Sequence, residues 1–575
     1  MDLDVKKFKT DVLVIGGGGA GVRAALEAAV QGAEVILVSK GPVARSGVTP
    51  LAGGDLVAAV GHRNPLDNPG VHAIDLIREG RYLADHSLIA ALVEDAPECV
   101  ADLERYGVKF RKKGDSFFQF FSPGETYPRS MSIIGKGYGM MRALKSELKK
   151  TVQCDVFEDV IITRLLKVDN NICGAVGLDM SIGKLLLIEA KSTILATGGN
   201  LQLWPHSDTP SECTGDGHAL AFYCGAELID MEMVLYYPLA LTGPESARGT
   251  LISYEDYLNP DICGGKLLNG RGEEFLPHGK PPGRDIMVQL IFKEINEGRC
   301  TDDGAVLLDL TYAPSVREKA RYINEKYLHE TDLHLRKVGV DLLEQPVHVA
   351  PATHYTLGGV RIDSFGNTTV EGLFAAGEVA GNVHGANRMA GNALTETQVF
   401  GRRAGAAAAE RATMVKIALT EAEINEVIKR EKELLLAIIK PIGGCKAAPF
   451  QLRNRLKEIM GRYVGFPRDE AGLKKAISEI SVLKSDLASG ISVADGYLYN
   501  LALIEALELI QMLTTAELVA RSALLRTESR GHHQRRDYPE TDNKAWLKHT
   551  RIRQTDSADI LVDTGDVEIK KPSAG

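Results

Sequence analysis

The chain has 575 residues, too many for one hydrophobic core, so several domains are expected. Its 44% hydrophobic and 25% charged residues are typical of a globular protein, and a formal charge of -9 argues against nucleic acid as the main partner. No uninterrupted apolar run reaches the roughly 18 residues of a membrane helix, and the N-terminus lacks the pattern of a secretion signal, which together predict a cytoplasmic protein.

A strand, a tight turn, a helix and a second strand are predicted for the N-terminal stretch DVLVIGGGGAGVRAALEAAVQGAEVILVSK. Residues 11–15 are mostly branched and apolar, as in a buried parallel strand. Gly16, Gly18 and Gly21 then follow the GxGxxG spacing, which allows the turn, the approach of a pyrophosphate and close packing of the helix on the strand. The helix directs its positive N-terminal end at the phosphates, so this turn is predicted to bind a dinucleotide.

The second strand, residues 34–38, ends without the acidic residue that holds the ribose in an NAD site. This favours a flavin site whose adenosine half is held elsewhere. Residues 192–200 and 371–379 are further apolar strands, expected to return to the same sheet edge. Glu378 and Asp216 are candidates for holding a ribose there, and the alternatives are a surface loop carboxylate and a plain turn aspartate.

The stretch HGANRMAGNAL, residues 384–394, holds one arginine among residues that are nearly all small. Small residues leave little room to hydrate a charge, so Arg388 needs either a buried acidic partner or an anionic ligand.

The eight cysteines are spread along the chain, and none forms a CxxC pair. Clusters and zinc sites usually need close cysteine pairs, so we expect buried free thiols and no metal in this chain. Any redox chemistry must then come from an organic cofactor.

Several short motifs occur in the order that one family has, over almost the entire chain. They are VIGGGGAG near the N-terminus, ATGG, TGDG, GRD at 283–285, HYTLGG at 354–359, GLFAAGE, HGANR at 384–388 and RTESRGHH near the C-terminus. By these motifs the chain resembles the flavoprotein subunits of succinate dehydrogenase and fumarate reductase, with their L-aspartate oxidase relatives.

The resemblance implies an α/β fold with a Rossmann-like FAD-binding domain formed by residues 1–230 and 346–412. An α+β capping domain, residues 231–345, is inserted between these segments and is expected to close over the substrate. A helical domain, residues 413–527, and a C-terminal extension, residues 528–575, follow. The extension is rich in His, Arg and Asp, for which a solvated or salt-bridged face is expected over a partner-binding role.

Adding a hydride to a C=C bond conjugated to a carboxylate needs a hydride donor, cations for the carboxylates, an acid and a lid that excludes water. The resemblance implies that FAD donates the hydride and that Arg388 and His354 bind carboxylate. It also implies that Arg284 is the proton donor, refilled by a relay because an arginine with a pKa above ~12 is a poor acid in water. From the residues alone, Arg284 could instead pair with Asp285, and His354 could be a core histidine.

The cofactor residues implied by the resemblance surround the predicted strand ends and the helix that begins near Asn392, whose positive end favours an anionic reduced flavin. They are Gly16, Gly18, Gly19, Ala20, Gly21, Ser39, Lys40, Ser46, Gly47, Gly53, Gly54, Ala196, Thr197, Gly198, Asp216, His354, Gly377, Glu378, Arg388, Asn392, Ala393 and Leu394.

Three departures from the family motifs bear on cofactor and substrate. The dehydrogenases attach FAD through the histidine of an RSHT-like motif, which reads RSGV here with Gly47 in its place. We therefore expect non-covalent FAD and a lower flavin potential that favours reduction of the substrate. Tyr237 replaces a substrate-binding histidine and carries no positive charge. The loop 252–265 replaces the family's TEGxRGEGG loop, has no arginine, and offers Glu255 as the relay carboxylate.

The leading hypothesis is the catalytic subunit of a fumarate reductase-like enzyme that receives electrons from an iron–sulfur partner subunit. The alternatives are reduction of a different unsaturated or bulkier acid at the same flavin, an L-aspartate oxidase that acts alone, and a non-catalytic electron-relay flavoprotein. Retention of Arg284, His354 and Arg388 argues against the last. We expect no direct membrane span, with any membrane contact made through partner subunits on the cytoplasmic face.

Overall fold

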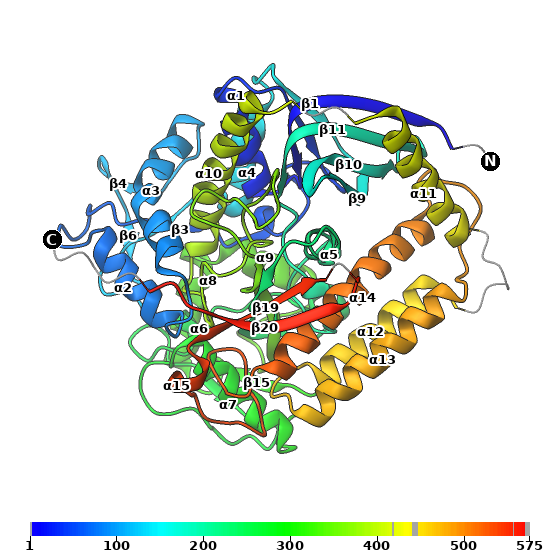
Figure 1. Cartoon of the computed structure of the whole chain (residues 1–575). Helices are drawn as coiled ribbons and strands as arrows, with labels where there is room; N and C mark the ends of the chain where they lie inside the picture. The colour runs from blue at the N-terminus through cyan, green and yellow to red at the C-terminus, as the bar shows by residue number, and fades with distance from the viewer. Residues whose placement is uncertain (1–2, 417–418, 440–446, 556, 570–575) are drawn as a thin grey trace. The chain divides into compact units, whose positions relative to one another are not determined.

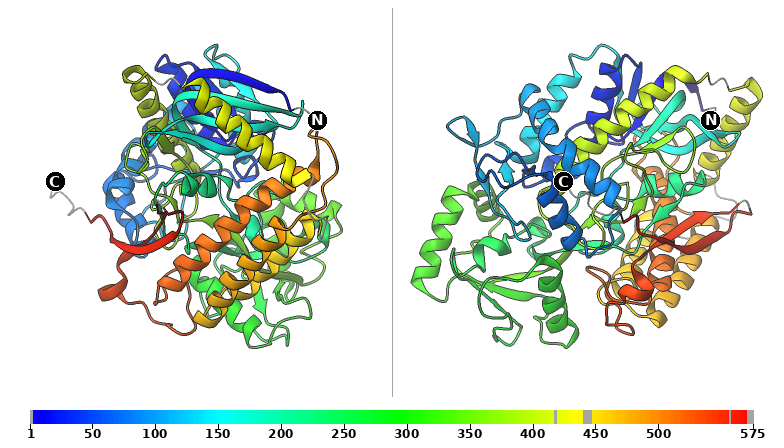
Figure 2. Two further views of the ribbon diagram at one scale, coloured as in Figure 1. Left: turned by 45° about the vertical axis from the view of Figure 1, so that its right-hand side comes forward. Right: turned by 60° about the vertical axis from the view of Figure 1, so that its left-hand side comes forward.

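The structure is a computed structural model that describes residues 3–416, 419–439, 447–555 and 557–569. The chain divides into two compact units: unit 1 comprises residues 1–205, 210–234 and 356–575, and unit 2 comprises residues 206–209 and 235–355. Figures 1 and 2 show the ribbon from three directions. Within the described ranges, none of the helices has both the length and the low polarity needed to cross a bilayer.

The central sheet of unit 1 carries the N-terminal glycine motif. Its strands are β1 (Val5–Ile15), β2 (Val35–Val38), β8 (Cys154–Phe157), β9 (Val160–Val168), β10 (Asn171–Asp179), β11 (Lys184–Leu195) and β18 (Leu373–Ala375). The order is β8–β2–β1–β11–β10–β9, and β18 pairs in parallel with the end of β11. Ile15 pairs with Leu195, and Leu195 pairs with Ala375, so three parallel strands end at one edge. The prediction that the strands within 192–200 and 371–379 belong to this sheet is confirmed.

Two helices begin at this edge and pack on each other, α1 (Gly19–Val30) and α10 (Asn392–Met414). Three further helices belong to the same part of unit 1: α2 (Pro69–Glu79), α3 (His86–Arg105), which packs on α10, and α4 (Lys136–Leu148). Short ribbons lie between them: β3 (Asp55–Val57) with β7 (Ser130–Ser132) and β6 (Gln119–Phe120), and β4 (Lys112–Lys113) with β5 (Ser116–Phe117). The 3-10 turn η1 (Thr49–Leu51) packs against α4.

The second half of unit 1 is helical. Its helices are α5 (Asp216–Tyr223), α11 (Glu421–Ile439), α12 (Pro449–Tyr463), α13 (Glu470–Ala488) and α14 (Leu501–Leu525). α12, α13 and α14 pack side by side, as Figures 1 and 2 show. α14 is rich in Leu and Ala, and most of its residues are buried, because neighbouring helices and α5 cover it on several sides.

The C-terminal extension is built into unit 1. After α15 (Asn543–Trp546), strands β19 (Lys548–Gln554) and β20 (Ile560–Asp566) form a hairpin that pairs with β12 (Leu228–Ile229), which in turn pairs with β17 (Gly359–Val360). Several charged residues around its start are buried and form ion pairs with one another, including Arg526, Glu528 and Arg530.

Unit 2 has its own sheet and core. The sheet has the order β13–β16–β15–β14 over β13 (Val234–Leu241), β16 (Val347–Thr356), β15 (Val306–Asp309) and β14 (Lys266–Leu268). Its helices are α6 (Tyr254–Tyr257), α7 (Arg284–Asn296), α8 (Pro314–Lys326) and α9 (His329–Lys337). Leu239, Ile291, Leu308 and Val349 are among the buried core residues.

Candidate active site

The glycine-rich turn joins β1 to α1 in the tightest packing of this region. Gly16 has a φ of 121°, and a Cβ on it would lie 2.1 Å from the carbonyl oxygen of Ala196. A Cβ on Gly21 would lie 1.8 Å from the carbonyl oxygen of Gly16. No other residue fits these two positions without moving the backbone. The turn therefore brings the start of α1 against the end of β11.

The helices at this edge begin without the side-chain cap that α2 and α13 of unit 1 have. α2 and α13 start with Asn68 and Asp469, whose side chains accept backbone N–H groups. In the described structure α1, α5 and α10 start after a glycine with no side-chain cap. Helix starts without a cap present their backbone donors and positive dipole ends to an anionic ligand.

Three of the predicted cofactor glycines face open space. A Cβ built on Gly47, Gly53 or Gly198 meets no atom within 4 Å among the described residues. Nearby in sequence, Oγ1 of Thr197 and both ring nitrogens of His218 are buried without a hydrogen-bond partner in the described ranges. Buried polar groups are normally satisfied, so these atoms favour a bound polar molecule. The glycines, the helix starts and these side chains fit a FAD.

Lys40 and Asp216, two predicted cofactor residues, bind each other. Lys40 Nζ lies 2.8 Å from Asp216 Oδ2 and 2.7 Å from Glu508 Oε1, and it donates to Thr214 Oγ1 at 3.0 Å. Thr214 Oγ1 also donates to the other carboxylate oxygen of Asp216. Burial raises the pKa of Glu508, and Lys40 opposes this rise. Lys40 thus joins the end of β2 to α14 through a buried carboxylate that no sequence motif indicated.

Glu378 lies in the turn that follows β18 and is buried. Its Oε1 accepts the backbone N–H of Thr356 at 2.9 Å, while Thr356 Oγ1 donates to Asn200 Oδ1 at 3.1 Å. A Cβ on Gly199 would lie 2.3 Å from the same Oε1. The second glycine of ATGG is therefore needed for the approach of this carboxylate.

The HGANR segment lies just before α10. Arg388 is buried, and its Nη1 donates to the carbonyl oxygen of Met389 at 3.5 Å. His384 Nε2 lies 3.0 Å from Glu396 Oε2 on the helix. His72 Nε2 lies 2.9 Å from Asn392 Oδ1, and burial, reinforced by Arg129, lowers the pKa of His72 to about 3.

The catalytic candidates of unit 2 form one cluster. Arg284, the first residue of α7, is buried, and its Nη2 lies 3.5 Å from Glu255 Oε1. Its guanidinium carbon lies 5.0 Å from the ring centroid of Tyr237, a cation–π distance. The Tyr237 hydroxyl donates to Glu255 Oε2 at 3.3 Å. Nη1 of Arg284 is buried and has no hydrogen-bond partner among the described residues.

The environment raises the pKa values of both members of the Arg284–Glu255 pair. Burial raises the pKa of Glu255, and Arg284 lowers it, with a net pKa above the ordinary value. Burial disfavours the charge on Arg284, but Tyr254, Glu255 and Tyr237 more than offset it, so the pKa of Arg284 is raised. Asp285, the neighbour in sequence, accepts from the backbone N–H of Ile286 at 3.0 Å. The carboxylate beside Arg284 is therefore Glu255.

His354 is held by a carboxylate that the sequence analysis did not identify. Its Nδ1 lies 2.5 Å from Asp208 Oδ2, and Asp208 is nearly fully buried. The imidazole packs against Tyr237, with ring centroids 5.4 Å apart. A carboxylate on Nδ1 fixes the orientation of the ring and stabilises its charged form. Asp208 belongs to no motif, so only the fold reveals it.

Seven cysteines form no disulfide in the described structure: Cys99, Cys154, Cys173, Cys213, Cys224, Cys263 and Cys300. Cys445 lies outside the described residues. Burial raises the pKa of Cys99, Cys154 and Cys173 to about 12, so these thiols are poor nucleophiles at neutral pH.

Comparison with known proteins agrees with this arrangement. The family described as "FAD binding domain" matches residues 11–394, and the family described as "Fumarate reductase flavoprotein C-term" matches residues 453–574. A chain of the fumarate reductase (CoM/CoB) from Methanothermobacter marburgensis is 40% identical over 545 residues, covering 94% of this chain and 96% of the relative. The fumarate reductase flavoprotein subunit of Escherichia coli is 30% identical, covering 98% and 95%.

Among solved structures, Sdh1 of Mycobacterium smegmatis in complex with UQ1 superposes with a TM-score of 0.90 at 32% identity, covering 99% of this chain and 96% of that chain. The fold and the glycine-lined edge thus define a FAD-dependent oxidoreductase. The chain belongs to the flavoprotein family of fumarate reductase and succinate dehydrogenase, whose enzymes act on CH–CH bonds. The predicted family, α/β fold class, FAD cofactor and enzyme class are confirmed.

Proposed function

We propose that this chain is the catalytic subunit of a reductase that adds a hydride and a proton across the C=C bond of an unsaturated carboxylate. The observation that carries the proposal is the Arg284–Glu255 pair, in which Arg284 Nη1 is buried without a partner among the described residues. A buried guanidinium with one unsatisfied donor and a carboxylate of raised pKa behind it is suited to deliver a proton.

Bound FAD supplies the hydride for one carbon of the double bond. In the proposed order of steps, Arg284 gives its proton to the other carbon of the double bond. It then takes a replacement proton from Glu255, which is protonated again by solvent. Glu255 is suited to this relay because burial raises its pKa, which favours the protonated form of the carboxyl. Tyr237 would hold both partners in place, through its hydrogen bond to Glu255 and its ring contact with Arg284.

We assign carboxylate binding to Arg388 and to His354, whose charged form Asp208 stabilises. Tyr237 can add a hydrogen bond but no charge, and its hydroxyl donates to Glu255. The cations proposed for carboxylate binding are therefore fewer than a family member with histidine at that position would have. Fumarate therefore remains one candidate substrate, with its second carboxylate bound without a full counter-charge. A different unsaturated acid is the other candidate.

We propose that FAD is bound without a covalent link, because Gly47 has no side chain to attack the flavin. We also propose domain boundaries at residues 230, 345, 412 and 527, and a capping role for residues 231–345. The cofactor role of the residues assigned above is supported by the glycine-lined edge and the helix starts.

An iron–sulfur subunit is the proposed electron-transfer partner. The relatives are named as subunits, and this chain has no closely spaced cysteines for a cluster of its own. A surface close to Gly47 in sequence supports a docking site: Leu51, Ile134 and Tyr138 are more than half exposed. The backbone N–H of Gly137 binds the carbonyl oxygen of Ala52, which joins η1 and α4 into one surface.

The neighbouring segment, whose Lys109 carbonyl accepts the backbone N–H of Ile134, is basic, with exposed side chains at Lys109, Arg111, Lys112 and Lys113, of which Lys112 pairs with Glu104. An apolar centre beside a basic segment fits a partner with an acidic rim. Leu51→Glu should abolish copurification of the iron–sulfur subunit, while Leu501→Glu, an equally exposed leucine on α14, should not. Copurification that survives Leu51→Glu and Ile134→Glu together would contradict this docking site.

A substrate panel tests the reaction. The purified chain, supplied with electrons by a dithionite-reduced dye, should reduce fumarate or another unsaturated acid and should form no product from L-aspartate and oxygen. Because the methanogen relative is named for CoM and CoB, these two thiols should also be tried as donors to the complete complex. Turnover of L-aspartate with oxygen, or turnover of no acid by a FAD-loaded protein, would overturn the proposal.

A further inference from the structure

The motif RTESRGHH, residues 526–533, has no part in the reaction proposed above, yet it is buried deep in unit 1. The side chains of Arg526, Glu528, Arg530, His532 and His533 are at most 2% exposed. Burying this many charged groups is unfavourable unless each is paired, and such a cluster is costly to disturb. The contacts of the segment therefore bear on what it does.

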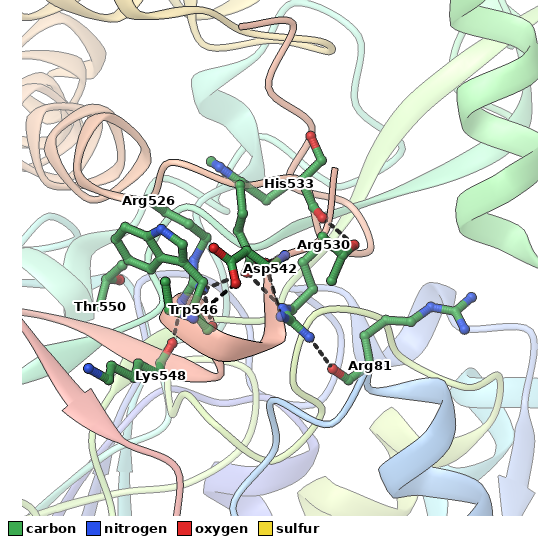
Figure 3. Close-up of polar contacts among 12 residues, drawn as sticks. Arg81, Arg526, Arg530, His533, Asp542, Trp546, Lys548 and Thr550 are labelled. Carbon is green, nitrogen blue, oxygen red and sulfur yellow. Dashed lines mark hydrogen bonds and ion pairs between the residues drawn. The ribbon is translucent and has the colours of Figure 1, made fainter. Parts of the chain in front are cut away.

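Its first half is anchored by charge. Arg526 binds Glu232 at 2.5 Å, Glu528 at 3.0 Å and Asp230 at 3.1 Å, and its guanidinium carbon lies 5.2 Å from the ring of Trp546. Figure 3 shows Trp546 beside Arg526, with Lys548 and Thr550 near the same network. The segment is thus fixed to the turn that follows β12 and to the C-terminal extension.

Its second half reaches the loop after α2. Arg530 binds both oxygens of Glu528, at 2.7 Å and 2.9 Å, and its Nη1 donates to the carbonyl oxygen of Arg81 at 2.9 Å, the contact drawn in Figure 3. The preceding carbonyl, of Gly80, accepts the backbone N–H of Ala386 at 2.9 Å. Arg530 and the HGANR segment therefore bind adjacent carbonyls of one turn.

The segment also contacts HGANR directly. The backbone N–H of His532 donates to the carbonyl oxygen of Ala386 at 3.1 Å. Gly531 has a φ of 54°, and a Cβ on it would lie 2.2 Å from the same carbonyl oxygen, so the two backbones touch. His532 Nε2 lies 3.2 Å from Asn387 Oδ1, and Asn387 Nδ2 donates to Glu79 Oε2 at 3.4 Å. Both ends of the Asn387 amide are therefore held.

The residue that follows Asn387 is Arg388. A backbone clamped at 386 and 387 leaves a buried arginine few directions for its side chain, and errors of about 1 Å in such a group can cost ~10²-fold in rate. We propose that His532 is a positioning residue that directs Arg388 toward a substrate carboxylate, with the segment 526–533 as its rigid support. This rests on the proposed role of Arg388 in binding carboxylate.

The test uses the full chain loaded with FAD and two probes, succinate and malonate, whose binding is followed by the change in flavin absorbance. His532→Phe removes the donor to Asn387 and should raise both dissociation constants roughly tenfold, as expected for a lost buried hydrogen bond. His532→Gln places an amide nitrogen near the position of Nε2 and should stay within about threefold of wild type. Reduction of the flavin by an artificial donor should be unchanged in both variants.

Two further variants keep the test decisive. His532→Asn is polar but too short to reach Asn387, and it should behave like His532→Phe, so it carries the test if the phenylalanine variant does not fold. Arg551→Gln removes a half-exposed ion pair with Asp563 in the C-terminal hairpin and should bind both probes as wild type does.

A double-mutant cycle separates this inference from the proposed function. If His532 acts through Arg388, adding His532→Phe to Arg388→Ala should weaken binding no further. If Arg388→Ala itself binds the probes normally, the proposed role of Arg388 fails. Suppose instead that Arg388→Ala binds the probes weakly. The positioning role of His532 is then wrong if folded, FAD-loaded His532→Phe and His532→Asn bind the probes as wild type does. It is also wrong if the losses of affinity from His532→Phe and Arg388→Ala add in the double variant.

Discussion

Replacing Arg284 by alanine tests the proposed proton donor most directly. The substitution removes the guanidinium from its contact with Glu255 and from the face of Tyr237, and it also removes the buried Nη1. Loss of a general acid usually costs ~10²–10⁴-fold in rate, which is about 3 to 5 kcal/mol of barrier. Loss of the positive charge adds to this cost.

The fold should tolerate the change. Arg284 lowers the pKa of Glu255, so without it Glu255 becomes easier to protonate, and a neutral carboxyl bonded to Tyr237 carries no unpaired charge. FAD should stay bound, because the glycine-lined edge belongs to unit 1 and Arg284 to unit 2. Arg284→Lys should recover little, since one ammonium group cannot replace both the contact with Glu255 and the second donor.

Turnover of the unsaturated acid with a dye-reduced donor is the assay, and flavin reduction by the donor alone is measured in parallel. Arg248→Ala is the matched control: it removes an arginine of the same unit whose pair with Glu245 is exposed, and it should keep full activity. If Arg284→Ala turns over at nearly the wild-type rate, the proton-donor assignment is wrong.

Four further predictions concern the relay, the cofactor, iron and pH. Glu255→Gln should slow turnover and remove the fall in rate expected as pH rises through the raised pKa of Glu255; an unchanged pH profile would exclude this relay. Acid precipitation should release all flavin into the supernatant because Gly47 offers no attachment, and coloured pellets would contradict this. The isolated, folded chain should contain no iron or acid-labile sulfide by elemental analysis. Asp230 and Asp85 overcome the effect of burial and raise the pKa of His549 to about 9, so its stabilising charge is fully present below pH 6.5 and lost as pH rises through 9. The free energy of unfolding should therefore fall by up to ~3 kcal/mol between pH 6.5 and 9, and the melting temperature should fall with it. His549→Gln should flatten this dependence of stability on pH.

The amino-acid sequence determined the features that depend on neighbouring residues. The apolar run before Gly16 and the GxGxxG spacing identify a strand, a turn and a helix, because both the apolar pattern and the glycine positions are local properties of the chain. The ordered motifs identified the family and its FAD cofactor, and the strands at 192–200 and 371–379 were found in the predicted sheet. These signals all lie within short continuous stretches of the chain.

Most pairings of charged side chains came only from the tertiary structure. Sequence proximity pointed from Arg284 to Asp285, and only the family resemblance offered Glu255, which the fold places beside Arg284. His354 binds Asp208, 146 residues away, and Lys40 binds Glu508 on α14.

Likewise, no pattern joins RTESRGHH to HGANR, yet their backbones meet at Gly531 and Ala386. The energy of an ion pair or hydrogen bond depends on the distance between two groups and on their burial. Both quantities are set by how distant segments pack, so local sequence patterns cannot encode them.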